Sequence, residues 1–209
     1  MRHVKFTAMS DGDRADFMFL ERAERSAAGA VSDRLLKLLE DLDGTPSAYR
    51  VSRREHCLQV ASRAWRDGAD ADWIITSLFH DVGDMFAPYN HDEFAAAVLR
   101  PYVREQCTWV VAHHGLFQRY YYAHHFGGDR DVRRRHKDNP YYDDCVKFCE
   151  RWDQLSFDPD YESLPVEKFV PMVNEVFGRE PYQPTTIASG TRQPLRNPVV
   201  AEARAVTGR

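Results

Sequence analysis

An adjacent histidine and aspartate, His80 and Asp81, end an apolar run and are followed closely by Gly83. Imidazole and carboxylate groups both bind metal ions, and both can transfer protons. Neighbouring side chains on a helix point in different directions, so this pair can meet one ion only where the helix end is shaped for it. Such a pair is common by chance, and its meaning depends on whether other donors complete a site.

Further histidines and one distant aspartate are spaced as a shared site would require. They are His56, His91, His113, His114 and Asp153. The interval between His56 and His80 suits one helix, a turn and a second helix, which can return the second histidine beside the first. Helices bring ligands to a common centre from their inward faces. The pattern therefore indicates a metal site inside a helical bundle.

Each donor also has an interpretation that involves no metal. His56 could be a hydrogen-bonded core histidine, and His91 could be a solvated residue at a helix start. Asp153 could pair with Arg151 on the surface, and the histidines at 124–125 are interpreted as part of an aromatic surface. Each of these interpretations can explain one residue by itself. If all of them held, the order of the donors along the chain would be a coincidence.

The elements that must position these donors are predicted to be helices. A Ser-x-x-Glu capping box at 52–55 would open a helix that carries His56 and runs to about 67–68. Residues 71–79 are nearly apolar on every side and predict a central helix, which the His-Asp pair closes. The other predicted helices are 17–25, one from residue 32 or 33 to 42, 92–105, 108–112, 140–153 and one that opens at Pro165. No segment alternates with a period of two, so the predicted fold class is all-α.

The length of 209 residues suits one domain with a sizeable core. We expect an N-terminal arm with a short helix over 1–30, the helical core over 31–177, and a Pro/Ser/Arg-rich tail over 178–209. Hydrophobic residues make up 43% and charged residues 29%, as in an ordinary globular protein. The net charge of −4 argues against nucleic acid or an anionic membrane as a partner.

Other features of the sequence bear on where the protein works. No apolar stretch approaches the roughly 18–20 residues of a membrane span, and the N-terminus lacks the apolar region of a signal peptide. The four cysteines show no CxxC spacing and lie in segments with helical patterns. We predict that they are buried, reduced thiols, which favours a cytoplasmic location.

The order His56, His80-Asp81 and Asp153 resembles the HD-domain superfamily, whose helical core binds divalent metal through four such residues. The added histidines, His91 and His113, resemble its dinuclear branch, and within that branch the chain is similar to the mixed-valent diiron oxygenases. These include the hydroxyphosphonate-cleaving HD oxygenases and, more remotely, myo-inositol oxygenase. The resemblance covers roughly residues 47–160 and is carried by segments 51–59, 79–83 and 140–153.

The resemblance implies an HD-domain helical bundle with two iron ions, Fe(II)/Fe(III), although imidazole ligands also suit other divalent metals. The implied ligands are His56, His80, Asp81, His91, His113 and Asp153. In this interpretation Asp81 bridges the two irons, and Asp81 and His80 form the catalytic centre. His91 and His113 hold the second iron. We prefer His113 to His114 because it lies nearer the end of the apolar helix face.

The residues expected to meet the substrate are Tyr49, Asp84, His114, Gln118, Arg119 and Arg151. Tyr49 stands where related oxygenases carry lid residues, and its alternative is an ordinary packing residue at a helix start. Asp84 and Phe117 replace a histidine and a lysine of the hydroxyphosphonate-cleaving enzymes, so a phosphonate dianion would be poorly held there. Asp84 could instead bind a substrate ammonium group. Arg119, Arg130, Arg151 or the basic run at 133–137 could supply the missing positive charge, although that run could also be a solvated face.

The predicted function is that of a diiron oxygenase that uses O2 to cleave a C–P or C–C bond of a small hydroxylated, charged metabolite. The aromatic segment 117–126 could cover such a site and exclude water, or it could serve packing alone. One alternative is a metal-dependent HD phosphohydrolase that acts on a small phosphoester or nucleotide. Another is a non-catalytic HD domain that binds metal or a small ligand.

Overall fold

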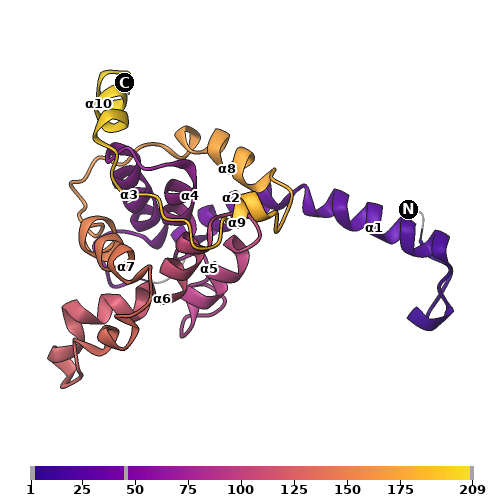
Figure 1. Ribbon diagram of the computed structural model, residues 1–209, viewed down its shortest axis with the longest axis horizontal. Coiled ribbons are helices and arrows are strands. Elements are labelled where there is room, and N and C mark those ends of the chain that lie inside the picture. Colours follow the sequence, from indigo (N-terminus) through magenta and orange to yellow (C-terminus); the bar gives the residue numbers. More distant parts are fainter. Residues whose placement is uncertain (1–2, 45–46, 208–209) are drawn as a thin grey trace.

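The computed structural model describes residues 3–44 and 47–207, and every regular element in those two segments is helical (Figure 1). The α-helices are α1 (Arg14–Ala28), α2 (Val31–Asp41), α3 (Arg53–Arg66), α4 (Ala71–Phe79), α5 (His91–Leu99), α6 (Glu105–Tyr122), α7 (Tyr142–Phe148), α8 (Val170–Phe177), α9 (Pro184–Ile187) and α10 (Pro198–Thr207). Short 3₁₀ turns and one π-helical turn, Cys149–Asp153, complete the chain. The all-α prediction is confirmed. Residues 1–2 and 208–209, at the ends of the expected arm and tail, lie outside the described residues.

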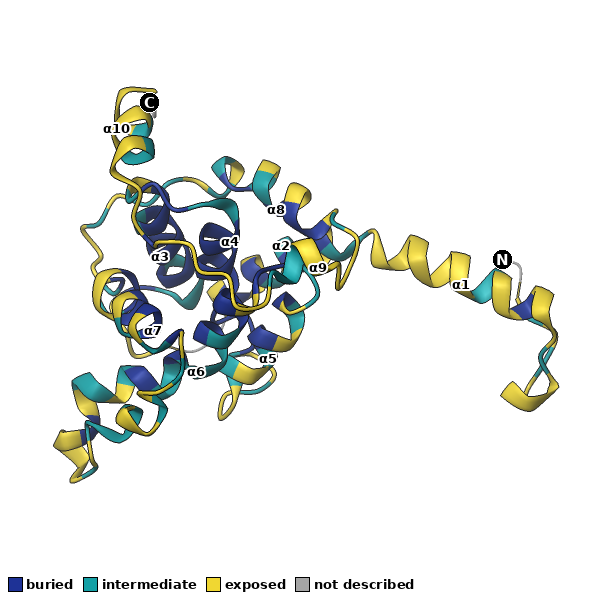
Figure 2. Cartoon of the chain, viewed as in Figure 1, coloured by how far each residue is buried: buried dark blue, intermediate teal, exposed yellow. Residues whose placement is uncertain are grey.

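Helix α4 forms the centre of the core. Every residue from Asp72 to Phe79 is buried, as the apolar pattern over 71–79 predicts. Figure 2 shows α3 and α4 as the most deeply buried elements, with α2, α6, α7 and α8 around them. The rings of Trp73 and Trp152 meet edge to face at 6.1 Å, which joins α4 to the π-helical turn. The core therefore holds together the two elements that end in His80 and Asp153.

Capping residues set where the two inner helices begin. The Ser52 hydroxyl accepts the N–H of Glu55 at 3.1 Å at the start of α3, as the capping-box pattern predicts. The Glu55 carboxylate instead accepts hydrogen bonds from Gln59 and Ser163. Asp70 caps α4 in the same way through the N–H of Trp73. These caps determine the residue at which each helix begins. They therefore also determine the direction in which each side chain of the two helices points.

Several predicted helix limits are corrected. The short helix expected at 108–112 is part of α6, which continues as one 18-residue helix through the aromatic segment. The helix expected at 92–105 ends at Leu99 because Pro101 follows and has no N–H to continue the helical hydrogen bonds. The helix expected at 140–153 ends as a π-helical turn, and α8 starts at Val170 after a 3₁₀ turn rather than directly after Pro165.

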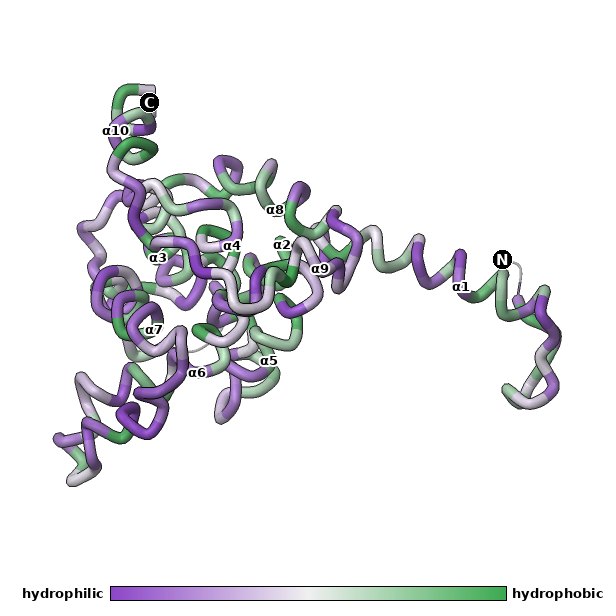
Figure 3. Tube along the Cα trace, viewed as in Figure 1, coloured by the Kyte–Doolittle hydropathy of each residue, from purple (hydrophilic) through white to green (hydrophobic). Residues whose placement is uncertain are grey.

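Helix α1 lies outside the body of the protein. It is longer than the expected 17–25 helix and is capped by Asp13, whose carboxylate accepts the N–H of Asp16. Figure 1 shows that it projects from the bundle, and Figure 3 shows hydrophobic residues along it even though most of the helix is exposed. Of its residues, only Asp16 is buried.

The C-terminal segment is spread across the bundle rather than packed on itself (Figure 1). The Gln193 carbonyl accepts hydrogen bonds from the side chains of Trp73 and Gln106, at 3.1 and 3.0 Å. Arg192 forms an ion pair with Asp144 at 2.8 Å, and Leu195 is buried. The segment therefore covers α4, α6 and α7.

Two observations bear on the setting of the protein. The four cysteines, Cys57, Cys107, Cys145 and Cys149, are free thiols and are all buried, as predicted. Across residues 3–44 and 47–207, the structure has no helix with the length and apolarity needed to cross a membrane.

Replacing Gly68 by alanine should destabilise the protein more than replacing Gly127. Both glycines have left-handed backbone, with φ of 76° and 71°, so each substitution should cost roughly 1 kcal/mol in strain. A Cβ at Gly68 would also collide with the Asn197 carbonyl and lie 2.6 Å from the N of Ala201, whereas a Cβ at Gly127 meets nothing within 4 Å. Urea unfolding of both variants measures the difference. Equal losses would contradict the packing of the C-terminal segment on Gly68.

Candidate metal centre

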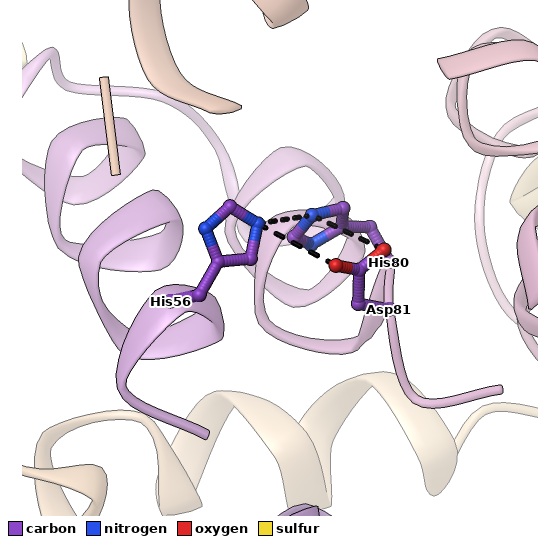
Figure 4. A group of neighbouring side chains, drawn as sticks. All are labelled: His56, His80 and Asp81. Atoms are coloured by element: carbon purple, nitrogen blue, oxygen red, sulfur yellow. Dashed lines mark hydrogen bonds and ion pairs between the residues drawn. The ribbon is translucent and has the colours of Figure 1, made fainter. Parts of the chain in front are cut away.

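Six side chains from separate elements converge beside α4. They are His56 from α3, His80 and Asp81 from the end of α4, His91 from the start of α5, His114 from α6, and Asp153 from the end of the π-helical turn. Figure 4 shows His56, His80 and Asp81 pointing toward one another. Helix α4 ends at Phe79 and the chain continues as turns, so both members of the His-Asp pair reach the same centre.

One half of the centre is formed by His56, His80 and Asp153. The Nε2 atoms of the two histidines are 3.1 Å apart. The Oδ1 atom of Asp153 lies 3.3 Å from Nε2 of His56 and 3.7 Å from Nε2 of His80. All three residues are buried.

The other half is formed around Asp81 by His91 and His114. Oδ1 of Asp81 lies 3.1 Å from Nε2 of His114 and 3.3 Å from Nε2 of His91. Its second oxygen, Oδ2, faces the first half and lies 3.5 Å from Nε2 of His56. Asp81 therefore stands between the two halves and contacts both.

The hydrogen bonds of the histidines determine which of their nitrogens face the centre. Nδ1 of His56, His80 and His114 each lies 2.7–2.8 Å from a backbone carbonyl oxygen. A carbonyl oxygen only accepts, so each Nδ1 must carry its proton, and each neutral ring presents the Nε2 lone pair inward. Carboxylate oxygens are also acceptors. The centre is thus a group of lone pairs and negative charges that needs a cation.

An oxygen of Asp153 supports the same conclusion. Its Oδ2 atom is buried and has no hydrogen-bond partner among the described residues. Leaving a buried charged acceptor unsatisfied costs more than the roughly 1–3 kcal/mol of a neutral group. The described histidines and aspartates could hold a metal ion, and this donor set fits one.

The pKa shifts show how the centre behaves without metal. Burial, the largest influence, lowers the pKa of His56, but the hydrogen bond to Asp153 and the charge of Asp81 outweigh it, and the pKa is raised. Burial also lowers the pKa of His80 and of His114, but the charge of Asp81 and a hydrogen bond with Asp153 raise the pKa of His80, and the hydrogen bond with Asp81 raises that of His114. Burial favours the neutral form of Asp153, yet hydrogen bonds from His56 and His80 hold its pKa well below the usual value. The carboxylates therefore favour positive charge at this centre, from protons on the histidines or from a metal cation.

The preference for His113 over His114 as a ligand is corrected by the structure. His113 donates through Nδ1 to the Trp109 carbonyl at 2.7 Å, and its ring stacks on Trp109 at 4.1 Å and meets His136 at 4.8 Å. It therefore lies on a different face of α6 from His114. The preference assumed a helix that ended at residue 112, whereas α6 runs on past both histidines.

Two glycines allow the elements of the centre to approach. A Cβ on Gly83 would lie 2.6 Å from the His91 carbonyl oxygen and 2.8 Å from the Cβ of Phe94. A Cβ on Gly115 would lie 3.3 Å from Oδ2 of Asp92. The close contact at Gly83 brings the start of α5, and with it His91, next to Asp81.

A pocket of about 630 Å³ opens onto the centre. Of the expected substrate residues, Tyr49, Asp84, His114 and Gln118 line this pocket. The Tyr49 ring stacks on Phe157 at 4.6 Å, and Phe157 in turn stacks on His56 at 4.4 Å. His114 belongs to the donor cluster itself.

Arg119 and Arg151 do not reach the pocket. Arg119 is exposed on α6, and Arg151 forms an ion pair with Asp67 at 3.0 Å. The histidines at 124–125 lie exposed in a 3₁₀ turn and pack on each other. Phe117 is fully buried and contacts Trp109 and Tyr142, so it serves packing.

Two pocket residues, Arg53 and Phe157, were not identified from the sequence. Tyr121, Tyr122 and Phe126 also line the pocket, and they belong to the aromatic segment 117–126 for which a covering role was considered. Arg53 could have been found, because residues three apart share a helix face and it precedes His56 by three. Phe157 follows the π-helical turn, and its position depends on tertiary folding.

Comparisons with known proteins add no relative. No protein-family model matches the chain, and a search of curated proteins gave no match. The geometry of the centre and its pocket therefore carries the functional conclusions.

Substitution of the two adjacent histidines of α6 tests the placement of the centre. We expect His114→Ala to weaken metal binding by more than about tenfold, because one inward donor is lost. His113→Ala serves as the matched control and should bind metal like the unaltered protein. Chelator competition measures both affinities. The assignment fails if His113→Ala causes the larger loss.

Metal-free and metal-loaded protein should respond oppositely to pH above about 6.5, the ordinary histidine value. The raised pKa values of His56, His80 and His114 mean that protonation stabilises the metal-free fold below that pH. This stability is lost as pH rises through the raised values. Metal competes with those protons, so the stabilisation by metal grows over the same range.

Melting temperatures with a chelator and with anaerobic Fe(II), measured across this pH range, check the prediction. At a hundredfold excess of metal over Kd the metal-dependent gain is about 2.7 kcal/mol. Parallel pH profiles for the two samples would show that the centre does not exchange protons for metal.

Proposed function

We propose that this protein is an HD-domain diiron oxygenase that uses O2 to cleave a C–P or C–C bond of a small hydroxylated, charged metabolite. The observation that carries the proposal is the position of Asp81, whose Oδ1 lies nearest to His114 and His91 while its Oδ2 lies near His56. Four histidines and two aspartates provide enough donors for two ions that share one carboxylate. The order of these residues along the chain also resembles the diiron branch of HD domains.

The ligands divide between the two proposed irons by their contacts. His56, His80 and Asp153 would hold one iron, His91 and His114 would hold the other, and Asp81 would bridge them. These are the ligands that the sequence predicts, except that His114 replaces His113. Bound irons would supply Lewis acidity for a substrate hydroxyl group and redox capacity for dioxygen.

The protein itself contributes orientation and shielding. Carbonyl groups fix the rings of three ligand histidines, so little rearrangement is needed when metal binds. Tyr121 and Phe157 form apolar parts of the pocket wall and would limit the access of water, whereas Tyr122 and Phe126 line the pocket but are themselves exposed. The part of the aromatic segment 117–126 that lines the pocket would thus contribute to covering the site.

A phosphohydrolase is the second candidate. The set His56, His80, Asp81 and Asp153 could by itself hold one divalent ion, as a hydrolytic HD domain requires. The contacts of His91 and His114 with Asp81 favour the two-iron centre, because a single ion in the first set would leave these two rings without a role.

Metal stoichiometry and oxygen use distinguish the candidates. We expect anaerobically reconstituted protein to contain close to two irons, and His91→Ala to retain one iron while it loses oxygen consumption. His113→Ala is the control and should keep both properties. A single tightly held divalent ion, together with phosphoester hydrolysis that does not require O2, would point to the phosphohydrolase instead.

The class of substrate can be surveyed by electron paramagnetic resonance on partly reduced protein. A coupled Fe(II)/Fe(III) signal is expected, and small α-hydroxy acids or hydroxyphosphonates that bind should alter it. The compounds that change the signal can then be tested for oxygen-dependent cleavage. An iron-loaded protein without any coupled signal would overturn the diiron proposal.

A further inference from the structure

The pocket contains several carboxylates and one strongly basic side chain. Asp81, Asp84 and Asp153 all line it, and among the described lining residues Arg53 is the sole lysine or arginine. The arginines expected from the sequence to supply positive charge lie elsewhere. Arg53 is therefore the available partner for a negatively charged ligand.

Arg53 lies at the edge of the donor cluster. It is in the first turn of α3, one turn before His56, so both side chains face the pocket. Its Nη1 atom is 3.8 Å from Oδ2 of Asp81, the oxygen that lies 3.5 Å from Nε2 of His56. An acidic group next to a metal-bound atom would come within reach of this guanidinium.

The contacts of Arg53 orient the guanidinium but leave donors for a ligand. Its Nε atom lies 2.7 Å from Oδ2 of Asp84, and its Cζ atom lies 5.1 Å from the centre of the Tyr49 ring. A guanidinium has five N–H groups and binds carboxylate or phosphate through two of them at once. The Arg53 side chain is 25% exposed, which leaves one side open to the pocket.

Asp84 has a different role from the one its position in the sequence suggests. Its carboxylate is only 8% exposed, pairs with Arg53 and lies 3.6 Å from Nδ1 of His91. A substrate ammonium group would have to displace Arg53 from this carboxylate. Asp84 instead holds Arg53 in position and partly neutralises it.

We propose that Arg53 is the specificity-determining residue of this pocket and binds the oxyanion group, carboxylate, phosphonate or phosphate, of a ligand held at the metal centre. This inference deepens the proposed function and depends on its metal centre. The substrate class is then a small hydroxylated acid, whose hydroxyl group faces the metal site and whose acidic group faces Arg53.

Binding of inorganic phosphate to metal-loaded protein tests the inference. Arg53→Gln should keep its metal content and bind phosphate about tenfold more weakly or worse, because a charge-assisted hydrogen bond is lost. Arg54→Gln is the matched control. Arg54 is the next residue in α3, is similarly exposed at 26%, and pairs with Asp43 at 3.7 Å rather than lining the pocket. This control should bind phosphate normally.

A second variant gives an effect of the opposite sign. Asp84→Asn removes the charge that neutralises Arg53, so it should bind phosphate more tightly, and adding Arg53→Gln should abolish that gain. Titration calorimetry with metal analysis of each sample measures both effects. Unchanged phosphate binding in Arg53→Gln, or loss of its metal, would overturn the inference.

The proposed role of Arg53 and the proposed oxygenase activity can fail separately, and the experiments distinguish the two failures. If the protein holds one ion and uses no oxygen, but Arg53→Gln still weakens phosphate binding selectively, the anion site stands and the oxygenase does not. If the protein holds two irons and consumes oxygen while Arg53→Gln binds phosphate normally, the oxygenase stands and the role of Arg53 is rejected.

Discussion

Mutual repulsion among inward-facing lone pairs is the constraint on which the rest of this structure depends. The Nε2 atoms of His56 and His80 lie 3.1 Å apart, and each ring has its other nitrogen fixed on a carbonyl group. Burial strengthens this repulsion because water cannot screen it. A cation or bound protons must compensate for it. The packing of α4 against its neighbours, with Trp73 against Trp152, holds the donors together against that repulsion.

The same need to compress donors into a small volume explains features outside the cluster. Gly83 lets the turn after α4 touch the start of α5, and the C-terminal segment closes over α4 through Trp73 and Gln106. Arg53 and Asp84 form a pair of opposite charges at the rim, 2.7 Å apart. The donors of the centre are thus packed from several elements at once, while the ion pair of Arg53 and Asp84 lies beside them at the pocket.

Much of the helical framework could be predicted from the sequence because capping and apolar periodicity are local signals, and most of the donors could be predicted from their order along the chain. Ser52 and the apolar run over 71–79 are examples. The choice between His113 and His114 could not be predicted, since it depends on the rotation of α6, and each residue turns a helix by about 100°. The packing of the whole 18-residue helix sets that rotation. Arg151 was expected at the pocket as a source of positive charge, and its ion pair with Asp67 could not be foreseen because Asp67 is distant in the sequence.

The π-helical turn at Cys149–Asp153 has a consequence for how this chain can change over evolution. The N–H of Gln154 bonds to the Cys149 carbonyl, five residues back, so this turn contains one residue more than an α-helical turn would. Deleting a residue here would let the helix relax into regular geometry and carry Asp153 away from His56 and His80. The number of residues between Tyr142 and Asp153 is therefore constrained more tightly than the identity of most of them. Insertions and deletions belong in the loops on either side.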